Sequence, residues 1–209
     1  MRIPINEAGY SYIAAMVVLT VMLYYAVANY LFLIPAGFAC FFIFFFRDPV
    51  REIPTGKNII LAPADGKVLS IEKEAHNDAI GGPATVIKIF LSPWNVHVNR
   101  APVSAKVMSV KQHSGHFRPA YSKGADKVNE QNRILLSAGC GKVEVVQIVG
   151  FLARRIKCFV KKNDEVRIGD KIGVIQFGSG TNLILSKTIK VSLTEGDKVR
   201  AGITIVARY

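Results

Sequence analysis

The stretch Lys171-Ile-Gly-Val-Ile-Gln-Phe-Gly-Ser-Gly-Thr-Asn-Leu-Ile-Leu185 predicts the fold of most of this chain. Two apolar runs, Lys171–Gln176 and Asn182–Leu185, stand on either side of Phe177-Gly178-Ser179-Gly180-Thr181. Short apolar runs with β-branched residues and glycine at their ends are typical of β-strands. The same pattern of short apolar runs continues through the chain after Pro49. This part of the chain is therefore predicted to be mainly β.

The remaining runs favour an antiparallel sheet, because they alternate apolar and polar residues as half-buried strands do. We expect an antiparallel barrel or sandwich with long loops, and a helical turn at Val149–Arg155. The other predicted strands are Lys67–Ile71, Thr85–Phe90, Ala105–Lys111, Arg133–Ala138, Val143–Ile148, Lys157–Phe159, Lys190–Leu193 and Thr204–Val206.

Two turn sequences resemble those of biotinyl and lipoyl carrier barrels. They are Ala62-Pro63-Ala64-Asp65-Gly66 and the Gly169-Asp170 segment that precedes Lys171. The chain lacks the Met-Lys-Met or Asp-Lys-Ala hairpin that would carry a prosthetic group in those barrels. The turns therefore indicate lipoyl-like geometry, and they leave a non-catalytic membrane-anchored adaptor as a second hypothesis for function.

The N-terminal region predicts a membrane anchor, because Tyr10–Phe46 contains no charged residue. About 20 apolar residues are enough to cross a bilayer as a helix. Asn29, Tyr30 and Pro35 indicate a break between two short helical segments, Tyr12–Ala28 and Tyr30–Phe46. A cleaved signal peptide fits less well, because the apolar region is long and no small-residue cleavage site precedes Arg47. We therefore divide the chain into an anchor, 1–47, and a β-rich domain, 48–209.

The distribution of arginines predicts the orientation of this anchor. Arg2 precedes the apolar region, Arg47 and Arg51 follow it, and the tip near Asn29 is uncharged. Positive charge concentrates on the cytoplasmic side of membrane proteins, which favours a hairpin with both ends in the cytoplasm. Entry into one leaflet only remains an alternative. We expect the β-rich domain at the cytoplasmic face of the cell membrane.

The net charge of +12 narrows the class of partner. Nucleic acid, an anionic membrane surface and an acidic small substrate all match a basic protein. We find no nucleic-acid-binding module and no basic cluster interleaved with aromatic residues, so no nucleic-acid partner is predicted. Beside an anchor, spread Lys and Arg favour anionic headgroups. The three cysteines show no metal-ligand spacing, so we predict no metal site.

The Gly178-Ser179-Gly180 tripeptide has two interpretations. The simpler one is a hairpin turn, because glycine accepts positive φ. The other is self-cleavage: the Ser179 hydroxyl attacks the Gly178 carbonyl to give an ester, and β-elimination then leaves a pyruvoyl group. Its ketone would accept an amine and act as an electron sink, as bound cofactors do in other enzymes.

Three further segments carry polar side chains suited to catalysis. Asp65 stands two residues after Pro63 and is suited to orient an imidazole or stabilise its charged form. His97 stands in Leu91-Ser-Pro-Trp-Asn-Val-His-Val-Asn-Arg100, where a histidine is well matched to proton transfer near neutral pH. Asn99 and Arg100 beside it are candidate substrate-binding residues, since arginine suits phosphate or carboxylate. His113 begins a segment that we expect to face the substrate.

Five segments together resemble the phosphatidylserine decarboxylase family, most closely its short bacterial and archaeal branch. They follow one another from about Phe45 to the C-terminus, after an apolar N-terminal region such as that branch has. The segments are Phe45-Phe-Arg-Asp-Pro49, Ala62-Pro-Ala-Asp-Gly66, Leu91-Ser-Pro-Trp-Asn-Val-His-Val-Asn-Arg100, Gln147-Ile-Val-Gly-Phe-Leu-Ala-Arg-Arg155 and Phe177-Gly-Ser179.

The resemblance implies a pyruvoyl-dependent proenzyme that cleaves itself between Gly178 and Ser179. The β chain would be Met1–Gly178, and the α chain, 179–209, would begin with the pyruvoyl made from Ser179. The amine of phosphatidylserine would form a Schiff base with it, lose CO₂ and leave as phosphatidylethanolamine. By the same resemblance, His97 is the decarboxylation histidine and Asp65 the aspartate of self-cleavage. Archaetidylserine remains an alternative substrate, and the oligomeric state, including a homo-oligomer, stays open.

The sequence departs from the longer family members at two positions. Gly180 follows the serine where they carry threonine, and Arg100 stands where they carry a second histidine. The base that activates Ser179 is therefore open between His97, His113 and a water oriented by Asp65.

Overall fold

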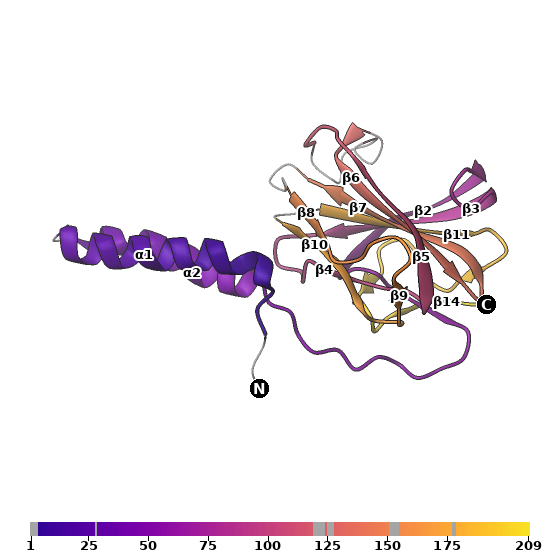
Figure 1. Cartoon of the computed structure of the whole chain (residues 1–209), viewed down its shortest axis with the longest axis horizontal. Helices are drawn as coiled ribbons and strands as arrows, with labels where there is room; N and C mark the ends of the chain where they lie inside the picture. Colours follow the sequence, from indigo (N-terminus) through magenta and orange to yellow (C-terminus); the bar gives the residue numbers. More distant parts are fainter. Residues whose placement is uncertain (1–3, 28, 119–123, 125–127, 151–154, 177–178) are drawn as a thin grey trace. The chain divides into compact units, whose positions relative to one another are not determined.

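The computed structural model describes residues 4–27, 29–118, 124, 128–150, 155–176 and 179–209. The chain divides into two compact units, Met1–Val50 and Arg51–Tyr209. The first is a pair of helices and the second is a set of β-sheets (Figure 1). The predicted antiparallel, mainly β fold, which follows apolar N-terminal helices in the sequence, is thereby confirmed.

The N-terminal unit contains two α-helices, each preceded by a 3₁₀ turn. The turns are Glu7–Gly9 (η1) and Tyr30–Phe32 (η2), and the helices are Tyr10–Ala26 (α1) and Leu33–Phe45 (α2). The chain leaves α1 at Val27, which is extended, and the Asn29 side chain caps the next turn by accepting a hydrogen bond from the Leu31 N–H at 2.9 Å. The predicted break near Asn29 is therefore present, although both helices end earlier than the sequence suggested.

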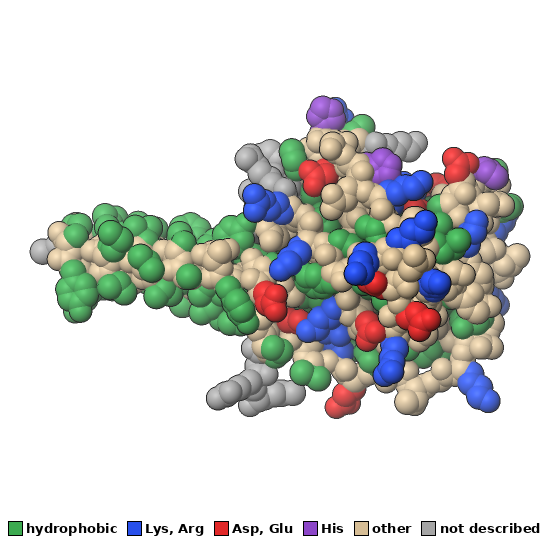
Figure 2. Space-filling model, viewed as in Figure 1, with side chains coloured by type: hydrophobic (Ala, Val, Ile, Leu, Met, Phe, Trp, Pro, Cys, Tyr) green, Lys and Arg blue, Asp and Glu red, His purple; other side chains and the backbone are tan. Residues whose placement is uncertain are grey.

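Most apolar side chains of this unit lie on its surface. None of the α1 residues is buried, and α2 buries only Pro35, Ala39 and Phe45. The space-filling view shows hydrophobic side chains along both helices (Figure 2). The segment Glu7–Ala26 is long and apolar enough to cross a membrane, and Tyr30–Phe45 is a shorter apolar stretch. An N-terminal helix of this kind weakly supports association with a membrane.

The second unit is built from three antiparallel sheets. The largest has eight strands in the order β13-β2-β3-β11-β7-β6-β5-β9, and the others have the orders β1-β14-β12 and β4-β10-β8. The large sheet comprises Lys198–Val199 (β13), Gly66–Asn77 (β2), Gly82–Leu91 (β3), Ser179–Ser186 (β11), Gly141–Val149 (β7), Gln131–Ala138 (β6), Ala105–His113 (β5) and Glu165–Val166 (β9). The small sheets comprise Ile59–Leu61 (β1), Ile205–Arg208 (β14) and Lys190–Val191 (β12), and Val98–Arg100 (β4), Lys171–Gln176 (β10) and Arg155–Cys158 (β8).

One main core lies between these sheets. Alternate side chains of the long strands point into it, as the two-residue period of a strand requires. Leu183, Val145 and Ile134 lie side by side on β11, β7 and β6, and all three are fully buried. Residues of β1, β10 and β14 complete the same cluster, so the small sheets close the apolar face of the large one.

Three turns in this unit share one construction, and the predicted Gly-Asp turn is one of them. In each, an aspartate carboxylate accepts the backbone N–H three residues earlier: Asp164 from Lys161 at 2.9 Å, Asp170 from Arg167 at 2.7 Å and Asp197 from Thr194 at 2.8 Å. The residue before each aspartate has positive φ, which explains Gly169 and Gly196 because glycine adopts such angles without strain. Each turn leads directly into a short strand.

One local prediction differs from the structure at its ends, and one alternative interpretation is excluded. Val149 ends β7 and Arg155 begins β8, so the ends of the predicted helical turn are strand residues, while 151–154 lie outside the described residues. The hairpin interpretation of the Gly-Ser-Gly segment also fails, because β10 and β11 belong to different sheets. Gly180 is an ordinary strand residue paired with Phe90 and Ile148, and Gly178 lies outside the described residues.

Candidate active site

Ser179 is the first residue of β11, where the chain passes from a small sheet into the large one. Residues 171–176 pair with β4 and β8, whereas Ser179 pairs through its backbone with Leu91 of β3 and Val149 of β7. Leu91 and Val149 are both fully buried. The serine therefore begins a central strand of the large sheet, beside the apolar core, whereas β10 just before it in sequence belongs to a small sheet.

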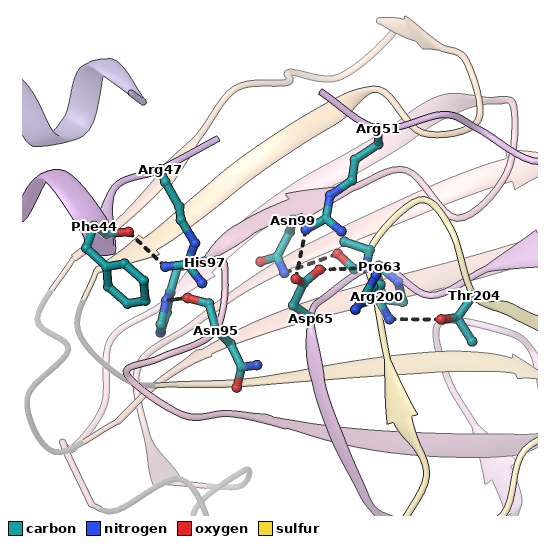
Figure 3. A network of polar contacts seen from close by, with 11 residues as sticks. Phe44, Arg47, Arg51, Pro63, Asp65, Asn95, His97, Asn99, Arg200 and Thr204 are labelled. Atoms are coloured by element: carbon teal, nitrogen blue, oxygen red, sulfur yellow. Dashed lines mark hydrogen bonds and ion pairs between the residues drawn. The ribbon is translucent and has the colours of Figure 1, made fainter. Parts of the chain in front are cut away.

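Asp65 is buried in the turn between β1 and β2, and both of its carboxylate oxygens accept hydrogen bonds. The guanidinium of Arg51 donates through Nη2 to Oδ2 at 2.8 Å, and the Ala201 backbone N–H donates to Oδ1 at 2.7 Å (Figure 3). Both side chains of the ion pair are about nine-tenths buried. Asp65 therefore contacts an arginine and a backbone amide, in place of the imidazole that the sequence suggested.

His97 lies directly before β4 and is 1% exposed. Its Nδ1 lies 2.9 Å from the carbonyl oxygen of Asn95 (Figure 3). Because a carbonyl oxygen can only accept, Nδ1 must carry a proton, and in the neutral ring Nε2 then holds the lone pair. The His97 carbonyl in turn accepts the Ile175 N–H at 3.2 Å, which fixes the histidine beside the end of β10.

Asn99 connects the Asp65 turn to the serine-bearing strand. Its Nδ2 donates to the carbonyl oxygen of Pro63 and to Oγ1 of Thr181, both at 3.2 Å. Figure 3 shows the Asn99 amide directed toward Pro63, two residues before Asp65. Thr181 is two residues after Ser179 on β11. The structure therefore brings Asp65, His97, Asn99 and the start of β11 together around one buried amide.

Arg100 is held against the backbone of a neighbouring turn. Its own N–H donates to the Pro63 carbonyl at 2.9 Å, and its Nη1 donates to the Gly169 carbonyl, also at 2.9 Å. The side chain is largely buried but lines a surface hollow together with Lys171 and Asp170. Arg100 thus lies next to the predicted site residues, with part of its donor capacity used by the protein.

His113 lies apart from this group. It is exposed at the end of β5 and lines a hollow that also contains Arg133 and Glu144. These two residues alternate with Ile134 and Val145, so the hollow is on the sheet face turned away from the main core. Arg133 binds Glu144 through two contacts of 2.9 and 2.7 Å, and these hydrogen bonds raise the pKa of Arg133.

Sequence reasoning missed four residues that the site contains: Arg51, Asn132, Gln147 and Thr181. A signal was present for Gln147, a polar residue at an inward position of the predicted strand Val143–Ile148, whereas Asn132 lies just before the predicted strand Arg133–Ala138. Both are essentially inaccessible to solvent. Among the described residues, no cluster of three or more His, Cys, Asp or Glu side chains is arranged to hold a metal ion.

The fold and this group of residues define a β-rich domain with a serine at the start of a central strand and a buried histidine bonded to the preceding strand, β10. Comparison with known proteins gives the family. Residues 38–207 match the model of the phosphatidylserine decarboxylase family. The chain belongs to that family, as its five motif segments predicted.

Individual relatives agree along nearly the whole chain. A phosphatidylserine decarboxylase proenzyme of Carboxydothermus hydrogenoformans is 43% identical over 202 residues, which cover 96% of this chain and 94% of that protein. The proenzyme of Desulfotalea psychrophila is 37% identical over 211 residues, covering 99% and 97%. That of Pelodictyon phaeoclathratiforme is 46% identical over 169 residues, covering 81% and 79%.

Proposed function

We propose that this protein is a phosphatidylserine decarboxylase that is made as a proenzyme and releases CO₂ to give phosphatidylethanolamine. The observation that carries the proposal is the family match, which extends over residues 38–207 and includes the Gly178-Ser179 bond. The buried polar group around Asn99, next to the start of β11, supports it.

Maturation is proposed to break the chain between Gly178 and Ser179. The Ser179 Oγ attacks the Gly178 carbonyl carbon, and the acyl group moves from nitrogen to oxygen. Elimination then breaks the Cβ–Oγ bond and leaves the Gly178 carboxylate as the end of the β chain. Hydrolysis of the resulting enamine consumes one water and releases one ammonia, which leaves a pyruvoyl group at the head of the α chain, 179–209.

The residues around the start of β11 suit such a group. Leu91 and Val149 pair with Ser179 through the backbone and are fully buried, so the strand neighbours of Ser179 are shielded from water. When formed, the pyruvoyl group supplies a carbonyl that accepts the substrate amine and withdraws electrons. The protein itself must then bind the headgroup, exclude water and supply one proton.

His97 is the residue that we propose for that proton. The Asn95 carbonyl holds its Nδ1–H at 2.9 Å and so leaves Nε2 as the proton-transferring atom. Loss of CO₂ leaves a carbanionic carbon that must be protonated, and an imidazolium at Nε2 is suited to that task. The same nitrogen is a candidate base for Ser179 during self-cleavage, with a water near Asp65 as the alternative.

Asp65 is proposed to act in self-cleavage by holding its turn in place. Its carboxylate fixes the turn through Arg51 and the Ala201 N–H, and the Pro63 carbonyl of that turn accepts hydrogen bonds from Asn99 and Arg100. Asn99 reaches Thr181 beside the proposed cleavage site. In this account Asp65 is a positioning residue, and Arg100, which lines the adjacent hollow, is the candidate contact for the substrate headgroup.

The apolar helices are proposed to hold the enzyme at a membrane that contains its substrate. Glu7–Ala26 has the length and composition of a membrane-crossing helix, and its surface is almost entirely apolar. The net charge of +12 favours a surface rich in anionic lipid. The flanking arginines favour a catalytic domain on the cytoplasmic face.

The proposal is tested with purified full-length protein in mixed micelles of detergent and phosphatidylserine. We expect carboxyl-labelled substrate to release labelled CO₂ with an equal amount of phosphatidylethanolamine. Parallel assays with ester-linked and ether-linked serine lipids establish the preferred backbone. Absence of CO₂ release from every serine lipid by fully cleaved protein would refute the proposed activity.

A further inference from the structure

A row of polar side chains crosses the large sheet directly beneath the proposed reaction site. Thr181, Gln147 and Asn132 are direct cross-strand neighbours on β11, β7 and β6. Each is at most 1% exposed. The next row on the same face, two residues deeper, is Leu183, Val145 and Ile134 and is wholly apolar. The polar row therefore separates the core from the start of β11.

The orientations of the Gln147 and Asn132 amides follow from one backbone carbonyl, through the Asn99 amide of β4. The Pro63 oxygen can only accept, so the Asn99 atom that faces it must be Nδ2. The Asn99 Oδ1 then accepts from Gln147 Nε2 at 2.8 Å, and the Gln147 Oε1 accepts from Asn132 Nδ2 at 2.8 Å. The hydrogen bonds thus run in one direction, from Asn132 to Asn99.

β10 holds this arrangement in place from the other side. A Cβ atom added at Gly173 would lie 2.7 Å from Gln147 Nε2 and 3.0 Å from its Oε1. Only glycine at this position lets the β10 backbone lie against the Gln147 amide. The strand that leads toward the proposed cleavage site therefore fixes the middle of the row.

The row ends in an acceptor whose capacity is not used. Asn132 Oδ1 is buried and has no hydrogen-bond partner among the residues that the structure describes. Buried polar atoms without partners are rare, because desolvation is not offset, and each calls for an explanation. Here the carboxamide is oriented through its nitrogen, so its oxygen is held in a fixed direction with no donor among the described residues.

We propose that Asn132 is a substrate-binding residue whose side-chain oxygen accepts a hydrogen bond from the amine nitrogen of the serine headgroup. The inference rests on the proposed function and adds a specific residue to it. Gln147 and Asn99 are positioning residues that fix the Asn132 amide. The oxygen is shielded in the uncut chain, so the inference requires that cleavage ahead of Ser179 opens a path to it.

The chemistry of an amine nucleophile favours an amide oxygen at this place. The amine must lose a proton before it attacks a carbonyl carbon. A carboxylate would stabilise the ammonium form and raise the pKa of the amine, which would hold the substrate in its unreactive state. A neutral amide oxygen binds both the ammonium and the free amine, so it orients the nitrogen without fixing its charge.

The test compares Asn132→Leu with wild type in the mixed-micelle assay, after cleavage and thermal unfolding of each protein have been recorded. We expect Asn132→Leu to cleave itself and to lose about tenfold or more in kcat/KM, mainly through a higher KM, since a binding contact is removed. Ile134→Val, one row deeper on the same strand, is the matched control and should keep the wild-type KM.

A double-variant cycle separates binding from general structure. If Gln147 acts through Asn132, Gln147→Met should lower kcat/KM in wild type but add little to Asn132→Leu. If Asn132→Leu does not fold, Asn132→Ser replaces it with the same readouts. Wild-type kcat/KM in a folded, cleaved Asn132 variant overturns the inference, as does full additivity with Gln147→Met. Inactive wild-type enzyme would instead refute the proposed function itself.

Discussion

The two units of this protein treat apolar side chains in opposite ways. In Met1–Val50, helix α1 buries none of its residues, although it carries no charge. In Arg51–Tyr209, the apolar side chains of the long strands are buried in one main core and a smaller second cluster, and Lys and Arg side chains are spread over the face seen in Figure 2. The β unit thus buries its own apolar side chains, whereas the helices leave theirs exposed and require an apolar environment from elsewhere. We therefore expect the β unit to carry the catalytic residues and the helices to attach the protein to a membrane.

The largest effect is expected from Ser179→Ala, which removes the proposed nucleophile of self-cleavage. The chain should stay uncut and release no CO₂, because no pyruvoyl group forms. Its partition into lipid vesicles should match wild type, since the helices are unaltered. Ser186→Ala, at the other end of β11, is the control and should cleave normally in gel electrophoresis. Cleavage of Ser179→Ala at the same bond would contradict the assignment.

His97→Ala should lower kcat by about 10²- to 10⁴-fold, the range for loss of a general acid or base. Steady-state assays on the cleaved fraction measure this directly. His113→Ala, on the opposite face of the large sheet, should have a far smaller effect. If both variants lose activity equally, proton transfer is not specific to the buried histidine.

Asp65→Ala should slow self-cleavage and destabilise the β unit. Removing one partner of a buried ion pair leaves Arg51 charged and unpaired, which costs about 3–5 kcal/mol. Urea unfolding of cleavage-deficient protein gives the free energy, and a time course of fragment formation gives the rate. Asp170→Ala, in an exposed turn of the same unit, serves as the control. Cleavage at the wild-type rate in Asp65→Ala would remove this residue from maturation.

A pair of leucine variants tests the contrast in burial itself. Leu183→Ala should lower the free energy of unfolding by about 2–5 kcal/mol, because the side chain is fully buried. Leu19→Ala in α1 should change it by less than about 0.5 kcal/mol in detergent, because that side chain is 40% exposed. Equal losses would show that the helices bury their apolar surface within the protein.

The smallest effect on kcat is expected from Val18→Lys. A lysine near the middle of a membrane helix costs about 2.5–3.5 kcal/mol of insertion free energy. Vesicle flotation should therefore show weaker binding than wild type, while kcat in detergent micelles stays unchanged. Unaltered flotation would mean that α1 does not enter the bilayer.

The strands that were predicted from the sequence are those long enough to show an alternation of apolar and polar residues. The bounds of Lys171–Gln176 are the same in prediction and structure, and the other long strands were extended by a few residues at their ends. β9 and β13 have two residues each, too few to show a period. The hairpin alternative for the Gly-Ser-Gly segment could not be rejected from the sequence, because glycine spacing alone does not reveal that β10 and β11 pair with different partners.

The candidate site was predicted in part for a similar reason. Asp65, His97 and Ser179 stand in motifs that resemble a family, so they were found from the sequence. Arg51 lies in a segment without regular structure, and its pairing with Asp65 depends on tertiary folding. Gln147 interrupts an apolar run and Asn132 stands in a polar one, and only the strand register shows that they lie in one row.

Self-cleavage at Ser179 is tested by intact mass spectrometry of the protein as purified from cells. We expect two chains that divide between Gly178 and Ser179. The smaller one should be lighter by one ammonia than the 179–209 peptide and should resist Edman degradation for want of an amine. A chain that keeps residue 179 as an intact serine while it releases CO₂ from phosphatidylserine would contradict the account.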